Sequence, residues 1–463
     1  MKKSLLLLTT SGLAFLAFSC SLDPKYKKPE PGISLQQSTS QEKISKVAWQ
    51  NFFQSPQLQQ LIESALKNNR DLQVAALNIE AMEANYGITK SSLFPTINGV
   101  ASKTEQSVPS AFSSFMPTRQ YRANLSLASY ELDFFGRLRS LKKSALEDFL
   151  STKEAHEVTK ISIITQTVNA YAQYLLDREL LEIAKDSVAT KQEKYRFIEM
   201  RYENGLASKT DLLNAESEIE SIKIAFEDYK KQIELDKNAL KILSGNFSDD
   251  LLKDEIKLED LKVNETALEF MASDVLLSRP DIKQAEHNLR NANANIGAAR
   301  AAFFPSITLT GTYGYSSNRL NGLTESKTWS YTPQINLPIF TGGKNWQNLK
   351  LSEITKKTEI IQYQQTIEKA FRETLDELAQ REAMVNKNES VTKILKARQK
   401  NYELSQAKQQ NGINSKSQVL DDKITFLTAR ESYLTLKKDY LVNLVNIYKV
   451  LGGGSEVEEE KAE

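Results

Sequence analysis

The sequence predicts an α+β fold class in which two copies of one module each contribute long α-helices and a β-hairpin. Three observations lead to this prediction: two glycine-free intervals of equal length, an internal repeat, and strands with one apolar and one polar face. The first interval runs from Gly136 to Gly205 and the second from Gly343 to Gly412. In each, the two glycines are 69 positions apart, with no proline and no other glycine between them. At a rise of 1.5 Å per residue, each interval predicts a helix about 100 Å long, which a compact enzyme core does not use.

The repeat shows that the chain is a tandem duplication. Residues 71–97 align without gaps on residues 281–307, at an offset of 210, and nine of the 27 pairs are identical. The identical pairs are Asp71/Asp281, Ala75/Ala285, Asn78/Asn288, Ala84/Ala294, Asn85/Asn295, Gly87/Gly297, Phe94/Phe304, Pro95/Pro305 and Ile97/Ile307. From Gly136/Gly343 to Ser208/Ser415 the offset is 207, and it becomes 208 where 241–245 aligns with 449–453. We expect repeat 1 at 71–245, a linker at 246–277 and repeat 2 at 278–451.

Each copy contains the same elements in the same order. The first helix ends at a Phe-Pro pair, because proline disfavours the helical conformation at the residue before it. A β-hairpin, a long helix, a tight turn and a return helix follow. The expected ranges are 96–133, 137–203 and 208–243 in the first copy, and 306–340, 344–410 and 415–450 in the second.

The turn between each long helix and its return helix has the pattern of a helix stop followed by a capping box. Glycine suits the left-handed position that ends a helix. A serine three residues later caps the next helix, and the third residue after that serine returns the hydrogen bond. These residues are Gly205, Ser208 and Asp211 in the first copy, and Gly412, Ser415 and Gln418 in the second.

The extended segments alternate apolar and polar residues, as Tyr121, Ala123 and Leu125 do with their neighbours. Such strands, about ten residues long with aromatics, are typical of a transmembrane barrel. A half-buried sheet of a soluble protein is the alternative that this pattern leaves open. Two hairpins supply only four strands, which cannot close a barrel, and open edges are not viable in lipid. In a membrane, several chains must therefore share one barrel, and three chains would supply twelve strands.

The N-terminus has the features of a secretory signal peptide at 1–19: Lys2 and Lys3, a short apolar run, and a small residue at the end. Cys20 follows directly and is the only cysteine, so no disulfide forms within the chain. Its position resembles a bacterial lipobox, which predicts lipidation at Cys20. The alternative is a plain signal peptide with an incidental cysteine.

Composition argues against several function classes. The formal net charge is +1, with no basic excess that would favour a nucleic-acid partner. His156 and His287 lie 131 residues apart without a cysteine partner, so we expect no metal site. No nucleophile and base stand together, so we expect no catalytic residues, no cofactor and no enzyme. Residues 452–463 have the composition of a disordered acidic tail.

The duplicated pattern of helix, Phe-Pro, hairpin and long helix resembles the TolC-like outer-membrane efflux protein family. It is most similar to the lipidated, NodT-type branch that serves resistance-nodulation-division (RND) pumps. The segments that carry the resemblance are Cys20–Pro29, Trp49–Leu72, Tyr130–Arg139 and Ser278–Asp281. The resemblance implies a homotrimer with a twelve-stranded β-barrel in the bacterial outer membrane and an α-helical barrel in the periplasm. Residues 20–70 would then be the lipidated segment and the start of an equatorial belt, to which 246–277 also belongs.

The resemblance also implies a function. Family members are passive exit channels of tripartite efflux systems, in which an inner-membrane RND pump and a periplasmic adaptor are the partners. Drugs or other small toxic compounds would be the cargo. Two alternatives remain open: an outer-membrane conduit for a type I protein secretion system, and a structural lipoprotein that spans the periplasm without a pore.

By position within the family, Thr210, Asp211, Gln418 and Asp421 would line a constriction at the periplasmic tip. Three copies of Asp421 would form a ring of carboxylates that favours cations. Some members lock this tip with a Tyr and an Arg, but this chain has Gln409 and Asn414 at those positions. The alternatives are a capping role for Asp211 and a solvated helix face for Asp421.

Overall fold

The computed structural model describes residues 21–30, 48–109, 118–245, 252, 256–265 and 273–453. The predicted signal peptide, Cys20 and residues 454–463 lie outside the described residues, as do residues 110–117 of the first hairpin. The chain divides into two compact units. The sheet unit comprises 1–30, 77–154 and 283–365, and the helical unit comprises 31–76, 155–282 and 366–463. Each unit therefore contains segments of both sequence repeats.

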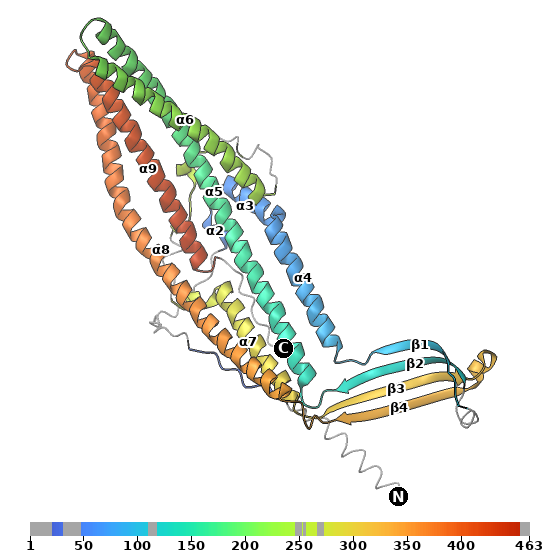
Figure 1. Ribbon diagram of the computed structural model, residues 1–463. Coiled ribbons are helices and arrows are strands. Elements are labelled where there is room, and N and C mark those ends of the chain that lie inside the picture. Colours follow the sequence, from blue (N-terminus) through green and yellow to red (C-terminus); the bar gives the residue numbers. More distant parts are fainter. Residues whose placement is uncertain are drawn as a thin grey trace. The chain divides into compact units, whose positions relative to one another are not determined.

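The helices of the two copies correspond in length (Figure 1). The long helices α5 (Arg137–Glu203) and α8 (Lys344–Gln410) have 67 residues each. The return helices α6 (Lys209–Leu243) and α9 (Lys416–Val450) have 35 residues each. The remaining helices are α2 (Trp49–Phe52), α3 (Pro56–Asn68), α4 (Arg70–Ser91) and α7 (Pro280–Ala301), with 3₁₀ helices η3 (Leu258–Asp260), η5 (Ser273–Ser278) and η6 (Leu320–Glu325). Within the described residues, no helix has an apolar segment long enough to cross a membrane.

The strands form one four-stranded antiparallel sheet, as Figure 1 shows. They are β1 (Ile97–Glu105), β2 (Arg119–Leu132), β3 (Ser306–Ser317) and β4 (Lys327–Asn336), and they lie in that order. β2 of the first copy pairs with β3 of the second copy. The two predicted hairpins are thus joined into a single sheet, which confirms the α+β fold class.

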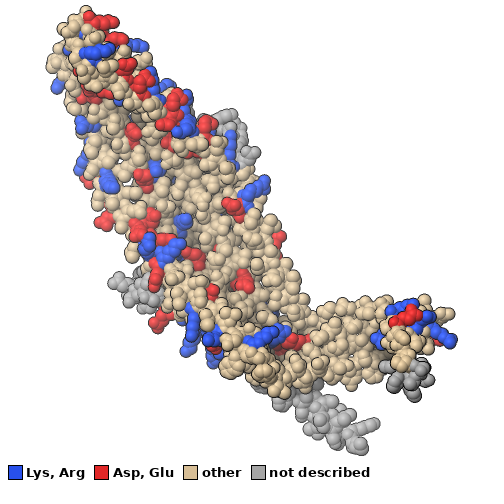
Figure 2. Space-filling model, in the orientation of Figure 1, with Lys and Arg blue, Asp and Glu red and all other residues tan. Residues whose placement is uncertain are grey.

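The register gives the sheet one apolar and one polar face, because residues paired across strands share a face. Leu125 pairs with Tyr313, which pairs with Trp329, and all three are exposed in the single chain. On the other face, the hydroxyls of Thr312 and Ser330 are 2.7 Å apart. Figure 2 shows that the charged side chains of the visible sheet face gather at its two ends.

A β-bulge interrupts β2 between Leu127 and Tyr130, with Ser129 at φ +40°. The extra residue returns Tyr130 to the face that carries Leu127, whereas strict alternation would place Tyr130 on the polar face. The Tyr130 hydroxyl donates to the Leu93 carbonyl at 3.0 Å. Alternation alone does not predict this change of face.

The core of the helical unit gathers aromatic and aliphatic side chains from α2, α3, α5 and α9. Phe52 of α2 stacks on Tyr448 of α9, with ring centroids 4.6 Å apart. Gly452 and Gly453, which the sequence predicts in a disordered tail, are buried here. Gly453 lies so close to Ile161 and Tyr448 that a side chain at that position would crowd both residues. The predicted disordered tail therefore does not include Gly452 and Gly453, which precede its acidic residues.

Candidate functional site

The turn between α5 and α6 lies in the helical unit and is closed by backbone hydrogen bonds. Gly205 has φ +73° and its N–H donates to the Tyr202 carbonyl at 2.9 Å. The Leu206 N–H donates to the Arg201 carbonyl at 2.7 Å. This pair of bonds is a Schellman motif, which satisfies the last carbonyls of α5.

The turn between α8 and α9 repeats the same geometry. Gly412 has φ +72°, and its N–H donates to the Gln409 carbonyl at 2.9 Å. The Ile413 N–H donates to the Lys408 carbonyl at 2.9 Å. The positive φ explains why both turns contain glycine, since other L-residues are strained there.

The caps of the two return helices differ. The Ser208 hydroxyl accepts from the Asp211 N–H at 3.1 Å, and the Asp211 carboxylate accepts from the Ser208 N–H at 2.9 Å. The second of these bonds lowers the pKa of Asp211. Ser415 also accepts, from the Gln418 N–H at 3.2 Å, but the Gln418 amide donates to Asp422 at 3.2 Å. The prediction that Gln418 returns the cap bond is wrong, because its neutral amide gains less than a carboxylate at a helix N-terminus.

Asp421 takes part in an ion-pair cluster that joins three helices. Lys194 of α5 lies 2.8 Å from Asp421 of α9 and 3.4 Å from Glu218 of α6, measured from Nζ to carboxylate oxygens. Burial lowers the pKa of Lys194, but the two carboxylates more than offset this and raise it above its usual value. A second pair joins Lys416 of α9 to Glu193 of α5 at 2.7 Å. Sequence reasoning missed Lys194, because only helix packing brings it beside a residue 227 positions later.

The other residues predicted for the tip lie on the surface or against the second turn. Thr210, Asp211 and Gln418 are exposed. Gln409 is half-buried, and the Asn414 amide donates to the buried Ser405 hydroxyl at 3.0 Å. Asn414 thus holds its turn to α8 through a neutral hydrogen bond.

The opposite ends of the return helices are held by equivalent residues of the two copies. The Asn69 amide donates to the Leu243 carbonyl at the end of α6, at 2.9 Å. Arg279, the counterpart of Asn69 at the offset of 210, donates to the Val450 carbonyl at the end of α9, at 2.8 Å. The duplicated fold therefore repeats this contact with two different side chains.

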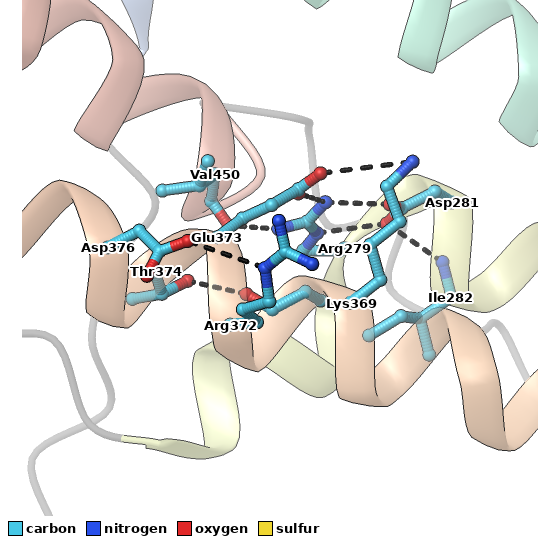
Figure 3. A network of polar contacts seen from close by, with 10 residues as sticks. Arg279, Asp281, Ile282, Lys369, Arg372, Glu373, Thr374, Asp376 and Val450 are labelled. Atoms are coloured by element: carbon cyan, nitrogen blue, oxygen red, sulfur yellow. Dashed lines mark hydrogen bonds and ion pairs between the residues drawn. The ribbon is translucent and has the colours of Figure 1, made fainter.

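The buried side chain of Arg279 forms the centre of a polar network, shown in Figure 3. Its guanidinium binds both carboxylate oxygens of Asp281, at 3.0 and 2.7 Å, and Glu373 of α8 at 3.0 Å. Charge-assisted bonds of this kind are strong when water is excluded. At the Val450 end of α9, the bond from Arg279 to the Val450 carbonyl is buried, whereas the ion pairs at both ends of the helix include partly exposed carboxylates.

The described residues contain no group of three or more His, Cys, Asp or Glu side chains that could hold a metal ion. His287 Nδ1 lies 2.7 Å from Glu147, and His156 Nδ1 lies 3.4 Å from Glu157. In these contacts each histidine has a single carboxylate neighbour.

The comparison with known proteins agrees with the internal duplication of the chain. A family model described as "Outer membrane efflux protein" matches residues 61–246 and 271–453, one segment in each copy. The toluene efflux pump outer membrane protein TtgC of Pseudomonas putida is 36% identical, covering 98% of this chain and 96% of its own length. The probable outer membrane lipoprotein SilC of Salmonella typhimurium is 34% identical, covering 97% and 98%. The open-state MtrE outer membrane channel of Neisseria gonorrhoeae superposes with a TM-score of 0.82 at 32% identity, covering 94% and 98%.

Proposed function

Because the chain belongs to the outer membrane efflux protein family, we propose that it forms the homotrimeric exit channel of a tripartite efflux system in the bacterial outer membrane. The sheet carries this proposal. Its four strands leave the outer edges of β1 and β4 unpaired among the described residues, and its apolar face is exposed. Three such sheets supply the twelve strands of a closed barrel, which removes every open edge from the lipid.

The partners and the cargo follow from the same assignment. An inner-membrane RND pump would supply the energy and a periplasmic adaptor would join the pump to this passive channel. Drugs, solvents or other small toxic compounds are the proposed cargo, since relatives carry the names of toluene and antibiotic efflux pumps. The family is one of transport channels rather than enzymes.

Lipidation of Cys20 is part of the proposal, and the name of the relative SilC as a lipoprotein supports it. Acyl chains would add about 0.8 kcal/mol of membrane affinity per buried methylene. Mass spectrometry of the mature N-terminus would detect the acylated Cys20. An unmodified Cys20 would contradict this part of the proposal and leave the channel intact.

The channel itself is tested by purification in detergent and reconstitution into planar bilayers. We expect a trimer on unboiled gels and discrete ionic conductance. A protein that stays monomeric and passes no current would contradict the channel and favour a structural lipoprotein.

For the tip, we propose that Thr210, Asp211, Gln418 and Asp421 lie at the constriction and that the pair of Lys194 and Asp421 holds it closed. Separate variants distinguish a latch from a ring of carboxylates. If the ion pair is a latch, Lys194→Ala and Asp421→Ala each raise conductance, and the double variant adds little to either.

If a ring of Asp421 carboxylates narrows the pore, Asp421→Ala raises conductance while Lys194→Ala leaves it unchanged or lowers it. Conductance unchanged in all three variants, with an intact trimer, would remove both roles. Lys223→Ala is a suitable control, because Lys223 forms an exposed pair with Glu220 within α6.

A further inference from the structure

Among the described residues, one charged side chain on the polar face of the sheet has no acidic partner, that of Arg122 in β2. Arg122 pairs with Ser316 of β3, which lies an even number of positions from Thr312 and therefore on the same face. Along β1, β3 and β4, every position of this face is Ser, Thr, Asn, Gln, Gly or Val. Charge on the polar face of the strands is thus confined to β2.

The second charged residue of this face, Glu131, lies near the opposite end of β2 and is neutralised. Glu131 pairs with Thr308 of β3, which places it on the polar face. Its two carboxylate oxygens accept from Nε and Nη2 of Arg137, at 2.8 and 2.6 Å. Such a bidentate pair fixes both partners strongly. Glu131 therefore adds little net charge to the face.

Arg122 binds a neutral partner instead. Its Nη2 donates to the side-chain carbonyl of Gln120 at 2.7 Å, and the Gln120 amide donates to the Ser316 hydroxyl at 3.0 Å. Residues 110–117 of the hairpin, outside the described part of the chain, contain no charged side chain. Hydrogen bonds therefore hold the guanidinium in place and leave its positive charge uncompensated within the described residues.

The position of β2 in the sheet protects this arrangement from assembly. β2 is an inner strand, with Ser102 of β1 opposite Arg122 on one side and Ser316 of β3 on the other. Only β1 and β4 have open edges at which another chain can pair. Assembly therefore brings no strand of another chain, and no acidic strand residue, next to Arg122.

We propose that Arg122 sets the charge selectivity of the barrel, because three copies form a ring of positive charge in the lumen that admits small anions more readily than cations. This inference rests on the homotrimer of the proposed function, in which the polar face of each sheet lines the lumen. Rings of Arg or Lys favour anions in pores, just as rings of Asp or Glu favour cations. The favoured solutes are inorganic anions and organic carboxylates, sulfonates or phosphates.

The dimensions of a twelve-stranded barrel make three charges sufficient. Strands about 4.8 Å apart and tilted by about 40° place the backbone about 12 Å from the barrel axis. Inward-pointing arginine side chains lie closer to the axis than the backbone does. An ion that crosses the ring therefore passes within about one Debye length of a guanidinium, which is about 10 Å at 0.1 M salt.

A cysteine in place of Ser102 measures the local potential, because Ser102 pairs directly with Arg122. We expect Ser102→Cys to react faster with an anionic methanethiosulfonate reagent than with a cationic one. Adding Arg122→Gln should lower the ratio of the anionic to the cationic rate by about tenfold at low salt. The ratio cancels any change in the thiolate fraction, since the same thiolate attacks both reagents. Arg122→Lys keeps the charge and should keep the ratio.

Thr310→Cys is the matched control for distance. Thr310 lies on the same face of β3, six residues from Ser316, which is about 20 Å along the strand and beyond the Debye length. Arg122→Gln should leave the rate ratio there unchanged. An unchanged ratio at Ser102→Cys, or an equal change at Thr310→Cys, would overturn the ring. Protein without an added cysteine gives the background from the native Cys20.

Ion selectivity of the reconstituted trimer is the functional test. All channels carry Asp421→Ala, which removes the carboxylates proposed at the tip. In a tenfold KCl gradient, Arg122→Gln should lower the permeability ratio of chloride to potassium severalfold. Lys103→Gln is the matched control, because Lys103 pairs with Tyr121 on the apolar face, and it should leave the ratio unchanged.

The outcomes separate this inference from the proposed function. A permeability ratio that does not change in Arg122→Gln, or that changes equally in Lys103→Gln, would overturn the selectivity role and leave the channel standing. A monomer that passes no current without any substitution would instead contradict the channel itself.

Discussion

Two aspartates illustrate how single residues depend on packing. Asp236 of α6 and Asp177 of α5 are both buried in the helical unit. Glutamines one helical turn earlier donate to each of them: Gln232 to Asp236 at 3.0 Å and Gln173 to Asp177 at 2.8 Å. Burial raises the pKa of Asp236 to about 6, Gln232 opposes this, and the negative charge of Asp177 adds to it.

We expect this raised pKa to make the stability of the protein depend on pH. Between about pH 4 and pH 6, Asp236 is protonated in the folded protein. In the unfolded chain, where an aspartate has a pKa of 3.8, it has released this proton. The resulting stabilisation, of the order of 2 kcal/mol, is complete below about pH 4 and is lost as the pH rises through about 6. Asp236→Asn should remove this loss, so that the midpoint of thermal unfolding falls less between about pH 4 and pH 7 than in the unchanged protein.

The control for Asp236 is Asp228→Asn on the same helix. Asp228 is exposed and pairs with Lys231 at 2.7 Å, so its replacement should leave the pH profile unchanged. Identical profiles for Asp236→Asn and the unchanged protein would show that Asp236 carries no extra proton.

Some candidate site residues could be predicted from the sequence and others could not. Gly205 and Ser208 follow from turn and cap chemistry, which is local and needs no knowledge of the rest of the chain. The position of Asp421 beside a turn is equally local. Its partner Lys194, and the role of Arg279, depend on contacts between helices far apart in sequence, and spacing carries no signal for either.

At the scale of elements, the two turns show that the glycine is required more strictly than the capping box. Both glycines have φ near +70°, whereas the capping box is complete at one turn and partial at the other. A missing cap bond can be replaced by water at an exposed helix end. A left-handed backbone position costs about 1–2 kcal/mol for a residue with a Cβ, and no neighbour relieves that strain.

We therefore predict that Gly412→Ala loosens the second turn. A cost of about 1 kcal/mol raises the population of the open turn about fivefold, which speeds hydrogen exchange of the Ile413 amide. Gly412→Asn should have a smaller effect, since asparagine tolerates this conformation. The Leu206 amide in the unchanged first turn is the internal control. Equal exchange of Ile413 in all three proteins would show that the turn is not under this constraint.

At the scale of the whole molecule, the sheet decides which face meets the membrane. Trp329 and Ser330 are neighbours in β4 but belong to opposite faces, because Trp329 pairs with Tyr313 and Ser330 pairs with Thr312. A lysine on the lipid face of a barrel costs about 2–4 kcal/mol near the middle of the bilayer, whereas a lysine facing the lumen stays in water.

We predict that Trp329→Lys lowers the yield of heat-resistant trimer in outer membranes, and that Ser330→Lys leaves assembly intact. Gel mobility of unboiled membrane extracts measures both. The same loss in both variants, or in neither, would mean that the apolar face of β4 does not meet lipid.

Sequence alone determined the duplication, the α+β class, the two glycine turns and the alternation of the strands. All of these depend on local conformational preferences or on the periodic spacing of buried residues, and both can be recognised in the sequence. Only the tertiary structure decided that β2 pairs with β3, that Lys194 meets Asp421, that Arg279 holds the end of α9, and that a bulge turns Tyr130 to the apolar face. Each of these depends on which of many chemically similar residues are brought together in space, and helical or strand periodicity is the same for all of them.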